Sequence, residues 1–227
     1  MIPFKDDNPT ETFPIVTILL IGLNCIVFFI ELGYPYGMER MIFSYGAVPR
    51  YLIGFSGPQP IPPPLTVFTS MFMHGGFVHI IGNMLYLWIF GNNVEDRLGH
   101  LRFIVFYLVS GAFAAYAQAL SSPSSTIPMV GASGAVASIL GAYLLLYPHA
   151  KVHTLIFFGF FIEVITLPAV LVIGLWGLIQ IMNGLLSKAA SIQGGVAWFA
   201  HIGGFLFGLL TIKLWLPRRR RPRVSWR

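Results

Sequence analysis

The strongest constraint on the fold of this chain is a series of long apolar stretches that contain almost no charged residues. Hydrophobic residues make up 56% of the 227 residues and charged residues only 10%, whereas soluble domains are about 25% charged. The stretches also lack the 3.6-residue pattern that gives a surface helix one polar face. The sequence therefore predicts an all-α membrane protein and excludes an ordinary soluble domain.

Six stretches have roughly the 17 to 25 residues that a helix needs to cross the hydrocarbon core of a bilayer. They cover residues 13–32, 74–93, 101–120, 131–147, 168–187 and 196–216. We expect one six-helix domain over residues 13–216, with short tails at 1–12 and 217–227. A long Pro-rich first loop, residues 34–73, is expected to be partly structured. Residues 152–166 are apolar but contain Glu163, so we interpret them as a loop or interfacial lead-in to the fifth span.

The basic residues predict the orientation, because cytoplasmic loops are enriched in Lys and Arg. With cytoplasmic termini, eleven basic residues lie on the cytoplasmic side and three on the outer side. Six of the eleven are in the C-terminal tail: Arg218, Arg219, Arg220, Arg221, Arg223 and Arg227. A basic cluster directly after an apolar segment favours contact with anionic lipid over nucleic acid. We expect a cell membrane, inner or plasma, with an organelle as the alternative.

The cysteine content and the N-terminal sequence argue against a Cys-based metal cluster and against a cleaved signal peptide. Cys25 is the single cysteine, so no internal disulfide and no Cys-based metal cluster can form. The N-terminal residues 1–12 are not basic and no small-residue cleavage site follows the first apolar stretch, so we read that stretch as a retained helix rather than a signal peptide.

Polar residues inside predicted spans are functional candidates, since burying them in lipid is unfavourable. The candidates are His74, His79 and Asn83 in the second span, Ser133 in the fourth and His201 in the sixth. In the predicted orientation all of them lie in the outer half of the membrane. Uncharged polar residues that occur singly are expected to bond to their own helix or a neighbour: Ser110, Gln118, Ser138, Gln180 and Asn183.

Ser133 gives the sharpest signal. The fourth span, 131–147, has 17 residues and reaches only about 25 Å at 1.5 Å per residue, so its start should lie below the outer surface. Ser133 falls in the first turn, where backbone N–H groups lack intrahelical acceptors and the helix dipole favours negative charge. These are the requirements of an oxyanion site.

Small residues predict that the fourth and sixth spans approach closely. Ser133, Ala137 and Gly141 share one helix face, Gly131 and Gly134 belong to the same small-residue ridge, and His201, Gly204 and Gly208 share a face of the sixth span. Such packing would bring the imidazole to the serine hydroxyl, which is the minimal activated nucleophile. No acidic residue lies in either span, so the sequence predicts a dyad.

His79 and Asn83 are four residues apart on one face of the second span. Both can donate hydrogen bonds, so we expect them to stabilise an oxyanion together with the Ser133 backbone N–H. Simpler readings exist: the ridge could serve packing alone, and His201 could be an ordinary interhelical hydrogen bond. A metal site is disfavoured, because His74 and His79 lack the i, i+4 spacing of a helical ligand pair and no carboxylate accompanies them. A serine, a histidine and a pair of donors are predicted at one depth in the membrane on three helices, and this combination favours a catalytic site.

Three motifs resemble those of the rhomboid intramembrane serine proteases: the segments 74–83, 131–134 (Gly-Ala-Ser-Gly) and 200–208 (Ala-His-Ile-Gly-Gly-Phe-Leu-Phe-Gly). The resemblance covers residues 13–216 and implies a Ser133–His201 dyad, an oxyanion hole from His79, Asn83 and the Ser133 N–H, and no metal or cofactor. It implies substrates that are single-span membrane proteins, cut near a small residue. It also implies that Trp176 lies on a substrate gate.

The chain departs from the family pattern at two places. The first loop lacks a Trp-Arg pair, and Ala137 stands where some members carry an aromatic residue against the catalytic histidine. The alternatives from other functional classes are a catalytically silent rhomboid-like protein that binds membrane helices, and a small-solute transporter.

Overall fold

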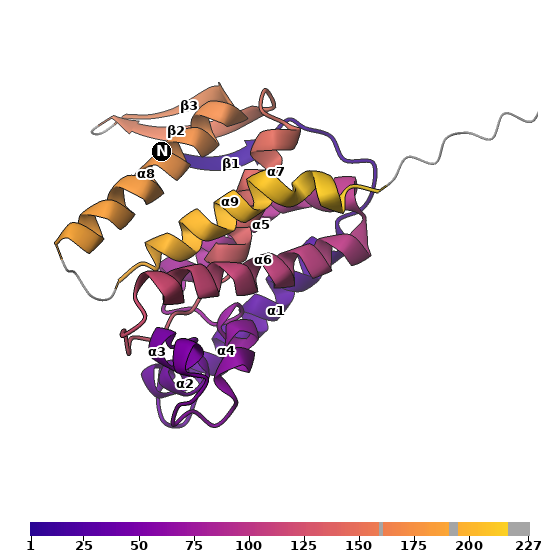
Figure 1. Cartoon of the computed structure of the whole chain (residues 1–227). Helices are drawn as coiled ribbons and strands as arrows, with labels where there is room; N and C mark the ends of the chain where they lie inside the picture. Colours follow the sequence, from indigo (N-terminus) through magenta and orange to yellow (C-terminus); the bar gives the residue numbers. More distant parts are fainter. Residues whose placement is uncertain (159–160, 191–194, 218–227) are drawn as a thin grey trace, which may run out of the picture.

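The computed structural model describes residues 1–158, 161–190 and 195–217. Over these ranges the chain forms nine helices and three short strands, so the fold is mostly helical. The strands lie at one end of the helix bundle and three short helices lie at the other (Figure 1). The tail arginines from Arg218 onward, which carry the predicted orientation signal, fall outside the described residues.

Each predicted apolar segment contains one long helix. These are α1 (Ile15–Leu32), α5 (Phe77–Leu98), α6 (His100–Ser121), α7 (Ser133–Leu146), α8 (Ala169–Ala189) and α9 (Trp198–Trp215). Among the described residues, α1, α6, α8 and α9 are long and apolar enough to cross a membrane, so the chain is a multi-pass membrane protein. Helix α5 ends in charged residues and α7 has only 14 residues. The count of six spans therefore stays a prediction.

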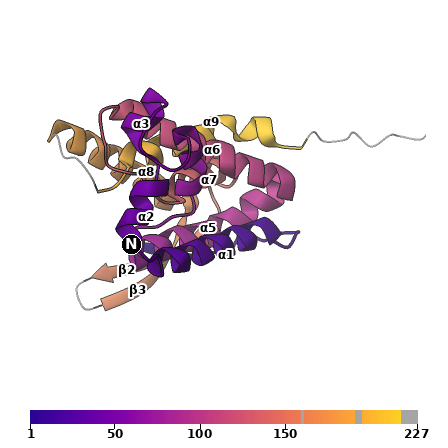
Figure 2. The ribbon, with the colours of Figure 1, turned by 90° about the horizontal axis from the view of Figure 1, so that it is seen from below.

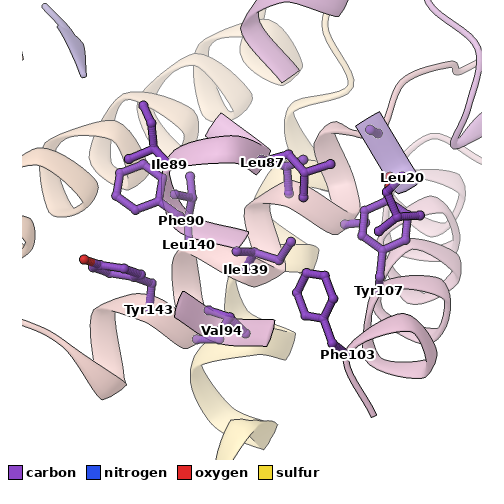
Figure 3. Packing of buried hydrophobic residues seen from close by; sticks show 14 of the residues in the cluster. Leu20, Leu87, Ile89, Phe90, Val94, Phe103, Tyr107, Ile139, Leu140 and Tyr143 are labelled. Atoms are coloured by element: carbon purple, nitrogen blue, oxygen red, sulfur yellow. The ribbon is translucent and has the colours of Figure 1, made fainter. Parts of the chain in front are cut away.

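Helix α7 lies at the centre of the bundle. Every residue from Gly134 to Tyr143 is buried, and the helix contacts α5, α6, α8 and α9. In Figure 3, Ile139 and Leu140 pack among apolar side chains that include Phe90 of α5 and Phe103 of α6. A helix without a polar face has to be surrounded by other elements. The residues at the start of α7 are consequently held by a rigid interior.

Helices α7 and α9 touch through glycines. A Cβ atom at Gly204 would collide with the carbonyl oxygen of Gly134, and one at Gly208 with the carbonyl oxygen of Ser138. A Cβ atom at Gly141 would collide with the backbone of α9 in the same way. Small residues allow two backbones to approach this closely. The predicted packing of the two small-residue faces is therefore present in the structure.

Helix α6 also packs against α7. The point that a Cβ atom of Gly134 would occupy lies 2.7 Å from the Cβ atom of Ala114. The hydroxyl groups of Ser110 and Ser138 join the two helices at 2.6 Å, which is the neighbour bond expected for isolated serines. Ala137 lies against α9, with its Cβ atom 3.4 Å from the Cβ position of Gly204.

The expectation of an all-α fold is wrong at residues 151–168. This stretch forms an antiparallel hairpin, β2 (Lys151–Phe158) and β3 (Phe161–Pro168), and β2 also pairs with β1 (Ile2–Asp6) in the sheet order β1-β2-β3. Both hairpin strands are rich in β-branched and aromatic residues, which favour strands. Residues 1–12, expected as a tail, thus contribute a strand. The Asp6 carboxylate accepts a hydrogen bond from the Tyr143 hydroxyl at 2.6 Å, which ties the sheet to α7.

The first loop contains three short helices, α2 (Met38–Tyr45), α3 (Pro49–Gly54) and α4 (Pro63–Ser70). They gather beneath the bundle in Figure 1, and Figure 2 shows them from below. The Gln59 amide donates to the carbonyl oxygens of Phe43 and Gly46 at 3.1 and 2.8 Å, so the loop is anchored without a Trp-Arg pair. Ala47 and Met129 exchange two backbone hydrogen bonds of 3.0 and 2.8 Å. The loop thereby braces the segment that leads to Ser133.

Glu95, near the end of α5, caps the start of α1. Its buried carboxylate accepts hydrogen bonds from the N–H groups of Val16 and Thr17 at 2.9 and 2.7 Å and from the Thr17 hydroxyl at 2.6 Å. The first N–H groups of a helix have no intrahelical acceptor and carry positive dipole charge. A buried carboxylate at this place is therefore stabilised.

Candidate active site

Ser133 is the first residue of α7, following the buried Ala132 at the N-cap. Its N–H group, like those of the rest of the first turn, has no acceptor within the helix. The preceding residue, Gly131, has a φ of 124°, a region that favours glycine, and its N–H donates to the Ser70 carbonyl oxygen at 2.8 Å. The sharp turn and this hydrogen bond to the end of α4 fix where the serine hydroxyl lies.

Gly131 itself does not pack between helices, contrary to the sequence prediction, because α7 begins two residues later. A Cβ atom at this position would lie 2.7 Å from His79 Nε2 and 3.5 Å from Ser133 Oγ. The glycine therefore allows the His79 imidazole to approach the backbone beside Ser133, where a side chain would collide with the ring.

His201 lies within hydrogen-bonding distance of Ser133. Its Nε2 atom is 2.8 Å from Ser133 Oγ, and the residues come from α9 and α7, 68 positions apart in the sequence. The contact follows from the close packing of the glycine faces described above, since Gly204 lies less than one turn after His201 and directly on α7. An imidazole at this distance can accept the hydroxyl proton, which converts the serine to a nucleophile.

Two glutamines that the sequence analysis set aside hold His201 in place. Gln180 of α8 lies 2.8 Å from the other ring nitrogen, Oε1 to Nδ1. Gln118 of α6 accepts hydrogen bonds through Oε1 from the N–H groups of Phe199 and Ala200, at 2.9 and 3.3 Å, and so caps the start of α9. A signal for Gln180 existed in the sequence: it lies four residues after Trp176, on the same helix face.

His79 and Asn83 lie on the same cavity as Ser133 and His201. The His79 Nδ1 atom accepts the Gly75 N–H at 3.4 Å, so in the neutral ring the proton resides on Nε2, on the side of Gly131 and Ser133. Asn83 is 7% exposed, and its Nδ2 atom has no hydrogen-bond partner among the described residues. Both side chains thus line the cavity that contains Ser133, and their role in an oxyanion hole stays a prediction.

Neither ring nitrogen of His74 has a hydrogen-bond partner in the part of the chain that the structure describes. Its backbone N–H donates to both carboxylate oxygens of Glu31 on α1, at 3.2 and 3.0 Å. The ring is buried with its edge toward His79, at 5.1 Å between centroids. Over the described ranges, no group of three His, Cys, Asp or Glu side chains is arranged to hold a metal ion. The backbone of His74, and not its ring, therefore links this segment to α1.

Aromatic side chains flank the His201 ring. Trp176 of α8 lies at 6.0 Å between ring centroids with a tilt of 34°, and Trp198 meets the ring edge-on at 6.1 Å. The aromatic contact that some relatives are expected to supply from the position of Ala137 is therefore supplied here by α8 and α9. Trp176 contacts the histidine directly, whereas its predicted role in a gate stays a prediction.

These residues border a cavity of about 1100 Å³. It is lined by Ser133, His201, His79, Asn83, Trp176 and the apolar side chains Val136 and Leu140, and also by residues of the 122–130 loop and of the 195–197 segment before α9. A cavity of this size, mostly apolar with a few convergent polar groups, fits a binding or catalytic site. The arrangement places a serine hydroxyl, an imidazole within hydrogen-bonding distance of it and the side chains of His79 and Asn83 on one cavity.

Comparison with known proteins places these groups in a wider context. A family model described as "Rhomboid domain" matches residues 64–218. The chain is 34% identical to RHOMBOID-like protein 4 of Arabidopsis thaliana over 68% of this chain and 34% of that protein. It is 32% identical to Rhomboid protease GluP of Bacillus subtilis over 62% of this chain and 25% of that protein. Rhomboid protein 1, mitochondrial, of Saccharomyces cerevisiae is 29% identical over 84% of this chain. The chain spans half or less of the length of these relatives.

Proposed function

Because the chain belongs to the rhomboid family, we propose that it is an intramembrane serine endopeptidase that cleaves single-span membrane proteins through a Ser133–His201 dyad. The observation that carries the proposal is the 2.8 Å contact between Ser133 Oγ and His201 Nε2 at the start of a buried helix. Relatives in the family include a protein named as a protease. A silent helix-binding protein would have no use for this contact.

In the proposed reaction His201 Nε2 takes the proton of the Ser133 hydroxyl while Oγ attacks the carbonyl carbon of the scissile peptide bond. The negative charge on the carbonyl oxygen is stabilised by the Ser133 N–H, the His79 Nε2–H and the Asn83 amide. Collapse of the tetrahedral intermediate breaks the C–N bond, and the imidazolium gives its proton to the leaving amine. A water molecule then hydrolyses the acyl-enzyme with His201 again as the base, and the serine is restored.

The membrane arrangement that goes with this proposal has six spans. They are the four helices that are long and apolar enough to cross a membrane on their own, together with α5 and α7. Both termini are cytoplasmic, in a cell membrane, which puts the Ser133 end of α7 toward the outer surface. Figure 1 agrees with such a division, because the sheet and the α2–α4 helices lie at opposite ends of the bundle. Substrates would reach the site from the bilayer, past the α8 helix that carries Trp176.

The test is cleavage of a reporter with one membrane span by the purified protein in proteoliposomes. Ser133→Ala and His201→Ala should each abolish cleavage, and a fluorophosphonate probe should label the wild type but not Ser133→Ala. Ser138→Ala is the matched control, since this serine lies on the same helix and bonds to Ser110, so labelling and cleavage should persist. Cleavage by folded Ser133→Ala at the wild-type rate would refute the proposal, and absence of both labelling and cleavage in the wild type would favour the silent binder.

A further inference from the structure

We infer that Gln180 of α8 is a positioning residue, which fixes the tautomer and the orientation of the His201 imidazole that faces Ser133. The inference deepens the proposed function and rests on it. The sequence predicted a dyad without a third member, because neither span that carries the dyad contains an acid. The structure supplies a neutral third member from a different helix.

The Gln180 side chain has one possible amide orientation. Its Nε2 atom lies 3.2 Å from the Trp176 carbonyl oxygen, one turn earlier in α8. A carbonyl oxygen only accepts hydrogen bonds, so the atom that faces it must be the NH₂ group. The amide oxygen, Oε1, therefore faces His201 Nδ1 at 2.8 Å. Turning the amide over would set two oxygens against each other at the backbone.

The orientation of the amide determines the protonation of the ring. Since Oε1 can only accept, Nδ1 of His201 has to carry the proton, and in the neutral ring Nε2 then holds a lone pair. That lone pair points at Ser133 Oγ, at 2.8 Å. One backbone carbonyl in α8 thus sets, through Gln180 and then His201, which atom accepts the serine proton. The other tautomer would present an N–H to the hydroxyl and could not act as its base.

An amide suits this environment better than a carboxylate would. Gln180 is 6% exposed, and an ionised side chain at such a place in a membrane protein is unfavourable unless it is paired. The amide oxygen still accepts from the imidazolium that forms during the reaction, and it does so without gaining or losing a proton itself. In the described residues no carboxylate is hydrogen-bonded to His201, so Gln180 is its partner at Nδ1.

A pH profile can isolate this effect. The other titratable groups on the cavity are His79 and Tyr86 of α5 and Lys188 of α8, and none of them changes in a Gln180 variant. A shift in the profile between variants therefore reports on His201. A carboxylate at position 180 would stabilise the imidazolium, so protonation of the base would extend to higher pH.

The experiment compares Gln180→Leu and Gln180→Glu with the wild type for kcat and KM of the single-span reporter over a pH series. We expect Gln180→Leu to lower kcat about 10- to 100-fold, on the scale of other residues that orient an active-site imidazole, with KM unchanged. Gln180→Glu keeps an acceptor oxygen, so it should recover most of the loss and move the acidic limb of kcat/KM to higher pH. Asn183→Leu, also a polar-to-apolar change on α8, is the control and should behave as wild type.

A readout without activity separates this inference from the proposed function. In Ser133→Ala labelled with ¹⁵N-histidine, solid-state NMR should show the His201 ring protonated at Nδ1, and the double variant with Gln180→Leu should show both tautomers. Wild-type kcat in Gln180→Leu, or equal losses in Gln180→Leu and Gln180→Glu with an unshifted pH profile, would overturn the inference. An unchanged tautomer in the double variant would overturn it even if the protein proves to be inactive.

Discussion

Substituting Gly208 by alanine tests whether the glycine contact between α9 and α7 sets the position of the histidine. A Cβ atom at Gly208 would lie 2.9 Å from Ser138 Cα and 2.6 Å from the Ser138 carbonyl carbon. Non-bonded carbon atoms prefer about 3.5 to 4.0 Å. The neighbouring atoms are backbone and cannot rotate away, so α9 has to move outward by about 1 Å to relieve the overlap.

The magnitude follows from that displacement. Overpacking typically lowers the free energy of unfolding by about 1 to 3 kcal/mol, and the better helix propensity of alanine offsets up to about 1 kcal/mol of this. We therefore expect the free energy of unfolding to fall by about 1 to 2 kcal/mol. His201 lies two turns earlier on the same face of α9, at 2.8 Å from Ser133 Oγ. A further ångström exceeds hydrogen-bond range, and a misplacement of this size costs about 100-fold in rate.

The assays are reporter cleavage in proteoliposomes and reversible unfolding in mixed micelles followed by circular dichroism. Gly22→Ala provides the control, because Gly22 is a helical glycine of α1 whose Cβ position has no neighbour within 4 Å. We expect this control to keep its cleavage rate and to lose no stability. If Gly208→Ala matched Gly22→Ala in both stability and cleavage, the close backbone contact would not control the site.

Four further substitutions test other parts of the structure. Glu95→Ala should lower the free energy of unfolding by about 2 to 5 kcal/mol, because it leaves buried donors at the start of α1 unpaired, whereas Thr17→Val should cost about 1 kcal/mol in the same unfolding assay. Asn83→Leu should lower kcat about 100- to 1000-fold with little change in unfolding, as for loss of one oxyanion-hole donor. Burial raises the pKa of Asp6, although its hydrogen bond from Tyr143 lowers it in part, so the folded state binds this proton more tightly than the unfolded state. The stabilising contribution of this protonation is therefore lost as pH rises above the ordinary value of 3.8. At pH 7, Asp6→Asn should have a higher free energy of unfolding than the wild type, and its stability should change less with pH above 3.8.

Local pattern was sufficient to predict the helices and the principal pair of the site. Apolar length gave the six helical segments, and small residues at helical spacing predicted that Ser133 and His201 would meet. The sheet was missed because half of its pairing is non-local: β2 pairs with residues 2–6, about 150 positions away. The strand propensity of residues 151–168 was a usable local signal, but apolar content in a membrane protein directed the interpretation toward a lead-in to a span.

Gln180 was missed for a different physical reason. A single amide in an apolar helix has many possible partners, and helical periodicity only says that it shares a face with Trp176. The angular position of α8 relative to α9 decides which partner it finds, and that angle depends on packing such as Gly184 against Ile202, at 3.2 Å from the Cβ position of the glycine to Ile202 Cδ1. The role of Gly131 was difficult to predict for a related reason. It follows from the backbone turn before α7 and not from the helical spacing of small residues.

The distribution of hydrogen bonds within the site separates its two proposed tasks. Hydrogen bonds join Ser133 to His201, His201 to Gln180 and Gln180 to the α8 backbone. The proposed base, His201, is therefore held in place before any substrate arrives. The Asn83 amide, in contrast, has a buried Nδ2 atom without a partner among the described residues. A buried donor without a partner costs about 1 to 3 kcal/mol. Under the proposed mechanism that cost is offset only when negative charge develops beside Ser133, so the amide stabilises the transition state more than the ground state. Asn83→Leu should consequently lower kcat while leaving the folded protein at least as stable as the wild type.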